Sequence, residues 1–331
     1  MSLLSDGEFF GLGTSMVVLL TVGCAFQAFT LLVLMQPAFK QFDLSPYFLN
    51  IMIANSVVVL VDFPPTIASA WAQENMLGEI YCQVRHWTEG KISSTFTETR
   101  KRIDKNADLL MRHANICTVS FFCQIVGFLS CVGCISTVVT LALCILKIHR
   151  KLSDDDMELE MAFAERDTWE RHKIIKTLTG TWLYGIAIMF PPLVGWGSFN
   201  FESGDTVCAP NWREENPAGR IYSVLLVIFA FVIPLGFSVA YFVKMYQRSS
   251  YVPDVNATAS RDRKRAKKAV IMILIGVIIF VVGWTPYYAC AMMSVFGGPE
   301  MFDPATSFIP GIIAKASAVF NPLICLLVSK R

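Results

Sequence analysis

Long apolar segments recur along this chain, and shorter polar segments between them hold most of the charged residues. A helix needs about 20 mostly apolar residues to cross the roughly 30 Å hydrocarbon core of a bilayer. Seven segments meet this condition, and they run from Thr14 to Met35, Pro46 to Trp71, Ile116 to Leu146, Ile174 to Trp196, Ile221 to Met245, Ala269 to Met293 and Pro304 to Val328. The pattern predicts an all-α membrane protein, a bundle of seven transmembrane helices in one domain.

The composition supports a membrane protein and argues against a soluble enzyme. Apolar residues make up 54% of the chain and charged residues 16%, against roughly 45 to 50% and 25% in soluble domains. A net charge of +2 gives no bulk attraction to nucleic acid. We therefore expect a multi-pass protein of the plasma membrane that does not bind nucleic acid.

Basic residues predict which end of the bundle faces the cytoplasm, because cytoplasmic loops are enriched in lysine and arginine. The segment before the first span contains neither residue type. The end of the fifth span and its connection to the sixth are strongly basic and include Lys244, Arg248, Arg261, Arg263, Lys264, Arg265, Lys267 and Lys268. This connection is therefore expected in the cytoplasm and the N-terminus outside the cell.

The segment 83–115 departs from this rule, since it is basic although it should lie outside the cell. A Cys-Gln-Val triplet begins at Cys82, and a near copy, Cys-Gln-Ile, begins at Cys123. The repeat suggests an insertion in the first extracellular loop. Two explanations stay open, a real loop and a retained intron, and the second is slightly preferred.

Enzyme and metal motifs are missing from the sequence. It has no P-loop, no glycine-rich dinucleotide turn and no His-Glu-x-x-His helix. Its four histidines all fall in predicted loops or at helix ends, which does not suit a buried metal site. We expect neither a metal site nor an enzyme of these classes.

A lysine near the middle of the seventh span is the most informative residue. Lys315 stands in an otherwise apolar helix, where insertion scales assign a lysine a cost of about 2.5 to 3.5 kcal/mol. Several apolar residues separate it from either end, so its amine does not easily reach the membrane surface. It is either paired with a carboxylate for helix packing, or it is a desolvated amine available to an aldehyde.

The surroundings of this lysine are similar to those in one receptor family. Lys315 stands six residues before Asn321-Pro322, and the sixth span carries Trp284-Thr285-Pro286-Tyr287. The chain thus resembles the animal opsins, the retinal-binding branch of the rhodopsin-like G-protein-coupled receptors, as a divergent non-visual or invertebrate-type member. The resemblance covers all seven spans except the insertion.

The resemblance implies that Lys315 carries retinal, in the 11-cis or all-trans form, as a Schiff base. It also implies that Trp284, Tyr287 and Phe231 contact the retinal. A Trp in an apolar span is, on its own, more often part of the core.

A buried cation requires a nearby carboxylate, and the resemblance offers two. Glu202 lies six residues before Cys208, a spacing like that of the counterion in many non-vertebrate opsins, and it is the first choice. Asp62, inside the second span, is the alternative. The position that vertebrate visual opsins use in the third span is Val126 here.

The resemblance also implies a disulfide between the outer end of the third span and the loop that contains Cys208. Cys123 is the preferred partner because it stands at the family's spacing from Lys147-Ile148-His149. Cys82 stays open as an alternative.

The motifs that usually couple such receptors to G proteins are altered. Lys147-Ile148-His149 stands where the family has Asp/Glu-Arg-Tyr, and Cys325 replaces the tyrosine that ends the Asn-Pro motif. Three functions stay open. The chain is a photoreceptor that signals through a heterotrimeric G protein, a retinal photoisomerase with weak or no coupling, or a rhodopsin-like receptor that does not sense light.

Overall fold

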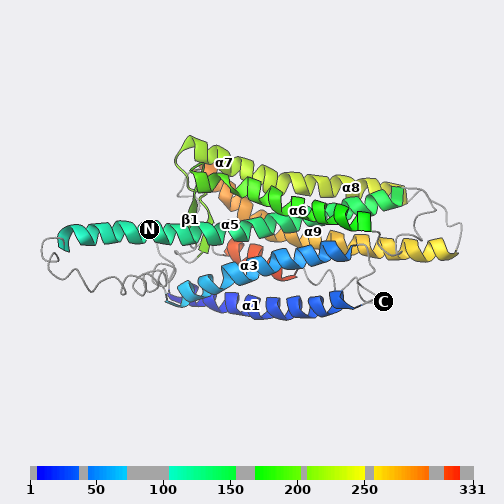
Figure 1. The fold of residues 1–331 in the computed structure, drawn as a ribbon, viewed down its shortest axis with the longest axis horizontal. Helices are drawn as coiled ribbons and strands as arrows, with labels where there is room; N and C mark the ends of the chain where they lie inside the picture. Colours follow the sequence, from blue (N-terminus) through cyan, green and yellow to red (C-terminus); the bar gives the residue numbers. More distant parts are fainter. Residues whose placement is uncertain are drawn as a thin grey trace.

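The computed structural model describes residues 6–36, 44–72, 104–153, 168–202, 207–249, 257–297 and 309–320. These residues form an elongated helical bundle (Figure 1). Its helices are α1 (Asp6–Met35), α3 (Ser45–Ala72), α5 (Asp104–Ser153), α6 (Thr168–Met189), α7 (Pro217–Val227), α8 (Ile233–Ser249), α9 (Ala257–Gly297) and the shorter helix Ile309–Phe320.

Five of the described helical segments are long and apolar enough to cross a membrane. They are Asp6–Met35, Ser45–Trp71, Cys123–Arg150, Pro217–Lys244 and Ile273–Gly297, and Ile309–Phe320 is a shorter apolar helix. Each overlaps one of the segments that the hydrophobic pattern predicts. The all-α, seven-transmembrane character expected from the sequence is thereby supported.

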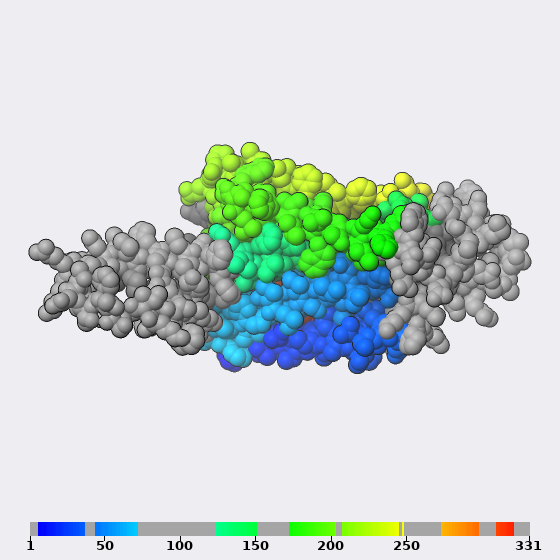
Figure 2. Space-filling model, viewed as in Figure 1, coloured from blue at the N-terminus to red at the C-terminus, as the bar shows by residue number. Residues whose placement is uncertain are grey.

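α5 runs through the middle of the bundle, with α3 on one side and α6 and α8 on the other (Figure 1). α1 packs against the outer side of α3, and the space-filling view shows α1, α3, α5, α6 and α7–α8 in succession across one face (Figure 2). Gly133 allows α5 to approach α3, because a Cβ atom there would lie 2.9 Å from the carbonyl oxygen of Ala54.

The helix in the fourth predicted span ends before the apolar segment does. α6 ends at Met189, and Pro191–Val194 forms a single 3-10 turn that Gly195 closes at a φ of 92°. Proline has no backbone N–H and therefore removes an i−4 hydrogen bond of the helix, and glycine adopts a positive φ without steric cost. The prediction that this helix continues to Trp196 is therefore wrong.

The fifth span contains a change of helical type. The π-helical turn Ile228–Val232 lies between α7 and α8, just before Pro234. A π turn leaves a carbonyl without its usual i+4 donor. Tyr184 of α6 donates a hydrogen bond from its hydroxyl to the carbonyl oxygen of Phe229, at 2.8 Å. This bond fastens the irregular turn to the neighbouring helix.

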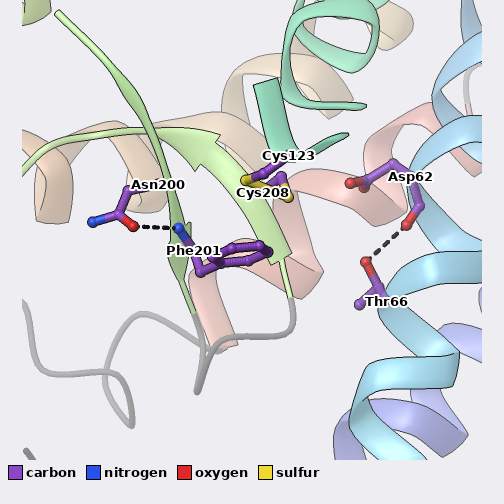
Figure 3. The surroundings of a disulfide bond; sticks show 6 residues. All are labelled: Asp62, Thr66, Cys123, Asn200, Phe201 and Cys208. Carbon is purple, nitrogen blue, oxygen red and sulfur yellow. Dashed lines mark hydrogen bonds between the residues drawn. A yellow bond between two sulfur atoms is a disulfide. The ribbon is translucent and has the colours of Figure 1, made fainter. Parts of the chain in front are cut away.

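A β-hairpin connects α6 to α7 at one end of the bundle. β1 (Phe199–Glu202) pairs antiparallel with β2 (Val207–Pro210). Cys208 on β2 forms a disulfide with Cys123 of α5, with the two Cα atoms 5.2 Å apart (Figure 3). The predicted pairing is confirmed. Cys82, the alternative partner, lies outside the described residues.

The described part of the predicted insertion is helical. α5 begins at Asp104, so residues 104–115 continue the third-span helix toward its N-terminal end (Figure 1). Residues 83–103 lie outside the described residues, as do Asn321, Pro322 and Cys325. The insertion stays a prediction.

Candidate functional site

A cavity lies inside the bundle beneath the β-hairpin. It is lined mainly by apolar and aromatic side chains from several helices and from the hairpin. Lys315 and Glu202 are the charged residue types in its lining. A mostly apolar cavity with a few converging polar groups is the usual form of a small-molecule site. Its aromatic lining residues are Trp212, Trp284, Tyr287, Tyr288 and Phe280.

The amine of Lys315 forms an ion pair with Asp62 of α3. The Asp62 side chain is 1% exposed and that of Lys315 15%. Only Oδ2 of Asp62 accepts a hydrogen bond from Lys315. Oδ1 has no hydrogen-bond partner among the described residues. In Figure 3 the carboxylate of Asp62 points away from the α3 axis toward the disulfide, while Thr66 bonds to its backbone oxygen at 2.7 Å.

Helical periodicity explains why Asp62 faces inward. Val58, Val59, Asp62, Phe63 and Thr66 are all buried, and spacings of three and four residues put such positions on one helical face. Asp62 therefore lies on the inward face of α3, although a carboxylate in a membrane helix is unfavourable unless it is paired.

The helix that holds Lys315 is fixed closely against α9. Trp284 donates a hydrogen bond from its indole nitrogen to the hydroxyl of Ser317, at 2.9 Å. Gly283 makes the close approach possible, because a Cβ atom there would lie 3.0 Å from Cβ of Ser317. The position of Lys315 in the cavity thus depends on this contact between the two helices.

Glu202, the carboxylate preferred from the sequence, has a different partner. Its Oε2 atom accepts a hydrogen bond from the hydroxyl of Tyr287 at 3.0 Å. Burial raises the pKa of Glu202 from its ordinary value of 4.5 to about 8, while the Tyr287 hydrogen bond and the charge of Arg213 lower it. Glu202 and Lys315 line the same cavity, but the direct partner of Lys315 is Asp62. Of the two predicted carboxylates, Asp62 is the one in direct contact with the Lys315 amine.

The predicted aromatic residues fall into two groups. Trp284 and Tyr287 both line the cavity and meet edge to face, with ring centroids 5.9 Å apart. Phe231 is not among the lining residues. It packs in the layer behind, against Tyr288 at 4.9 Å and Phe280 at 6.3 Å. The structure therefore places Phe231 as a support for the cavity wall.

Trp212 is a cavity residue that the sequence reasoning missed. It lies just after β2 and is 3% exposed, and its indole nitrogen donates to the hydroxyl of Tyr287 at 2.9 Å. The available signal was its position four residues after Cys208, which the disulfide holds over the bundle. Cys131 and Cys134 of α5 also line the cavity.

The opposite end of the bundle lacks the usual charged switch. Ile148 is 7% exposed and belongs to an apolar cluster with Ile273 and Val277 of α9. Lys147 lies over the ring of Tyr47 at 5.4 Å, and the ring of His149 meets that of Tyr241 edge to face at 5.3 Å. Apolar and aromatic contacts therefore hold this end of α5.

A protein-family model described as "7 transmembrane receptor (rhodopsin family)" matches residues 159–324, half of the chain. The chain belongs to the rhodopsin family of seven-transmembrane receptors. Its predicted kinship with the animal opsins is confirmed as well, because the similar proteins include melanopsins, a peropsin and a parapinopsin. The receptor is thus an integral, multi-pass membrane protein.

Two relatives and one solved structure show the extent of the similarity. Melanopsin of Rutilus rutilus is 32% identical over 163 residues, which cover 46% of this chain and 32% of that protein. The visual pigment-like receptor peropsin of Mus musculus is 26% identical over 159 residues, 47% of each chain. The chain thus covers about a third to a half of the length of these curated relatives. Squid rhodopsin superposes with a TM-score of 0.75 at 16% identity, covering 98% of this chain and 83% of that chain, which shows a shared fold.

Proposed function

We propose that this rhodopsin-family receptor is a light sensor of the plasma membrane that holds retinal through Lys315 and signals to a G protein. The observation that carries the proposal is the pairing of Lys315 with the buried Asp62 at an apolar, aromatic cavity. Retinal supplies a light-absorbing polyene and an aldehyde, and the aldehyde condenses with a primary amine with loss of one water molecule.

The cavity residues fit such a ligand. The polyene and ring of retinal are apolar, and most of the lining is apolar or aromatic. Asp62 keeps one carboxylate oxygen without a hydrogen-bond donor among the described residues, so it is able to accept a second one. A carboxylate with this spare capacity suits a cation at the nitrogen of Lys315.

Asp62 is the proposed counterion. The neighbouring helix α5 carries an uncharged residue, Val126, at the position that vertebrate visual opsins use for this role. Val126 of α5 is buried in an apolar cluster with Cys123 and Cys208. Val61, the chain neighbour of Asp62, packs against the same cluster. The carboxylate therefore approaches Lys315 from α3, while position 126 of α5 carries an apolar side chain.

The contact between Trp284 and Ser317 offers a route from the cavity to the helices. Trp284 lines the cavity and bonds to the helix of Lys315, and it stacks on Phe280 with ring centroids 5.7 Å apart. Displacement of Trp284 by a change in ligand shape would disturb both α9 and the Lys315 helix. Such a change of packing in a two-state element is how a ligand shifts a receptor between conformations.

A retinal photoisomerase is the second candidate function, and the cytoplasmic end of α5 favours it. Ile148, in its apolar cluster, provides no positive charge for an ion pair or for a G protein. Members of the receptor family are in general not enzymes, so the light sensor remains the first proposal. The two functions share Lys315 and the cavity, and they differ in the fate of the isomerised retinal after light is absorbed.

Reconstitution with each retinal isomer tests the proposal. Purified receptor incubated with 11-cis retinal, and separately with all-trans retinal, should form a visible pigment with at least one isomer. Extraction before and after illumination then identifies the retained isomer. Light-dependent second-messenger changes in cells, lost in Lys315→Ala, support the sensor. Release of a changed isomer with no such response supports the photoisomerase. Failure to form pigment with either isomer contradicts both.

A further inference from the structure

A short chain of hydrogen bonds runs from Trp212, just after β2, through Tyr287 of α9 to the carboxyl of Glu202 on β1. The indole nitrogen of Trp212 donates to the hydroxyl oxygen of Tyr287 at 2.9 Å. The hydroxyl of Tyr287 donates to Oε2 of Glu202 at 3.0 Å. Trp212 and Tyr287 are 3% and 7% exposed, so the Trp212–Tyr287 bond is buried, while the Tyr287–Glu202 bond is partly buried. The chain joins three residues of the cavity lining that come from two different parts of the fold.

The chemistry of the three groups favours one direction for these hydrogen bonds. An indole N–H is only a donor, whereas a phenol has one proton to donate and lone pairs to accept. The phenol proton goes to Oε2 of Glu202, and the bond from the indole makes the phenol a stronger donor, because hydrogen bonds in a chain polarise one another. Without the indole donor, the phenol would be a weaker donor and a better acceptor, which favours the reverse bond from a protonated Glu202.

The ring contacts show that Trp212 is also held in place. Its ring meets that of Tyr287 edge to face at 6.1 Å and that of Tyr288 edge to face at 6.2 Å. Both tyrosines belong to α9, while Trp212 comes just after the disulfide-bound strand β2. The segment after β2 thus packs against α9 through Trp212, the first donor of the three hydrogen-bonded residues.

We propose that Trp212 is a positioning residue, which sets the direction of the Trp212–Tyr287–Glu202 hydrogen bonds and thereby keeps the Glu202 carboxyl as an acceptor at the cavity. This deepens the proposed function, since Glu202 lines the same cavity as Lys315. The hydrogen bonds join protein groups alone, so the proposal is testable in the retinal-free receptor.

The proposal predicts how the protonation of Glu202 responds to Trp212. Among the described residues, the groups that face Glu202 are Tyr287 from α9, Arg213 after β2 and Cys131 from α5, and Lys315 lines the same cavity. Loss of the indole donor weakens the phenol as a donor to the charged carboxylate, because hydrogen bonds in a chain polarise one another. The protonated carboxyl gains an acceptor at the same time. Both effects favour the protonated form.

Infrared titration of the retinal-free receptor in lipid nanodiscs measures this directly. The carboxyl stretching band of protonated Glu202 is assigned by its loss in Glu202→Gln. In Trp212→Phe, the titration midpoint should rise by roughly half to one pH unit, the equivalent of one neutral hydrogen bond. Benzothienylalanine at position 212, which keeps the bicyclic ring and lacks the N–H, should give the same shift if Trp212→Phe does not fold.

Two controls separate the proposed role from a general effect of tryptophan loss. Trp196→Phe also removes an indole donor in the α6–α7 connection, the one to the carbonyl of Ala218 at 2.8 Å, and it should leave the midpoint unchanged. In a Tyr287→Phe background, the change at position 212 should have no further effect. An unchanged midpoint in the position-212 variants would overturn the proposal, as would an equal shift in Trp196→Phe or a persistent shift without the Tyr287 hydroxyl. None of these outcomes depends on pigment formation.

Discussion

Lys315 and Asp62 lie 253 residues apart in the sequence and form an ion pair between the last described helix and α3, with the Asp62 side chain buried and that of Lys315 15% exposed. The pair puts the proposed counterion on the second span of the bundle. The corresponding face of α5 presents Val126, which is buried in an apolar cluster. The ion pair therefore joins the helix that carries Lys315 to α3, while Glu202 on the hairpin is bonded to Tyr287.

The two carboxylates should have different effects on the pigment. Asp62→Asn removes the direct partner of the Lys315 nitrogen, so the nitrogen should lose its proton near neutral pH and the absorption should move from the visible to the near ultraviolet. Glu202→Gln should leave the pigment in the visible range, because Glu202 is bonded to Tyr287. Absorption spectra of the two variants over a pH series make the comparison. An ultraviolet pigment in Glu202→Gln with a visible one in Asp62→Asn would assign the counterion to Glu202.

The ion pair should also show itself in the stability of the retinal-free receptor. Removing one partner of a buried pair leaves an uncompensated charge and costs about 3 to 5 kcal/mol, whereas replacing both is far less costly. Asp62→Asn and Lys315→Met should therefore each lower the unfolding free energy, and the double variant should be more stable than the additive sum predicts. Thermal or denaturant unfolding in the same detergent provides the four values. Additive effects would show that the two groups do not interact.

Close packing of α3 on α5 should make Gly133 intolerant of a side chain. The added methyl of Gly133→Ala would lie 2.9 Å from a backbone oxygen, and such overpacking costs about 1 to 3 kcal/mol. Gly180→Ala in α6 is the matched control, because no atom lies within 4 Å of its added Cβ. The control should be neutral or gain up to about 1 kcal/mol from helix propensity. Equal unfolding temperatures for the two variants would contradict the described helix contact.

The raised pKa of Glu202 predicts a pH dependence of stability. Between pH 4.5 and about 8 the folded receptor holds a proton on Glu202 that the unfolded chain has released. Stability should therefore decrease as the pH rises through this window. In Glu202→Gln this part of the slope should vanish. Unfolding measured at several pH values tests it, and a slope that persists unchanged in the variant would exclude Glu202 as its source.

Much of the fold was predictable because it depends on local pattern. Apolar length identified the transmembrane segments, and the exceptional charge of Lys315 marked the site. The end of α6 at Met189 was missed, although the prolines just beyond it provide the physical reason. Periodicity and hydrophobicity locate a helix, but they do not show how that helix is rotated against its neighbours.

Rotation and long-range contacts explain what the sequence did not settle in the site. Asp62 and Glu202 were both plausible partners of Lys315, and only the inward rotation of α3 and the hydrogen bond from Tyr287 distinguish them. Phe231 faces the next layer because of its place in the π-helical turn. Trp212 enters the cavity through the folded hairpin, which no helical pattern describes.

Covalent capture of retinal on Lys315 tests the central claim most directly. The reconstituted receptor is treated with borohydride, which reduces and fixes a carbon–nitrogen double bond, and its peptides are then analysed by mass spectrometry. The account predicts a retinyl group on the peptide that contains Lys315, and no retinyl peptide in Lys315→Ala, with Lys244→Ala retaining the label as a control. A retinyl group on another lysine, or an unmodified Lys315 peptide in a sample that has formed pigment, would contradict it.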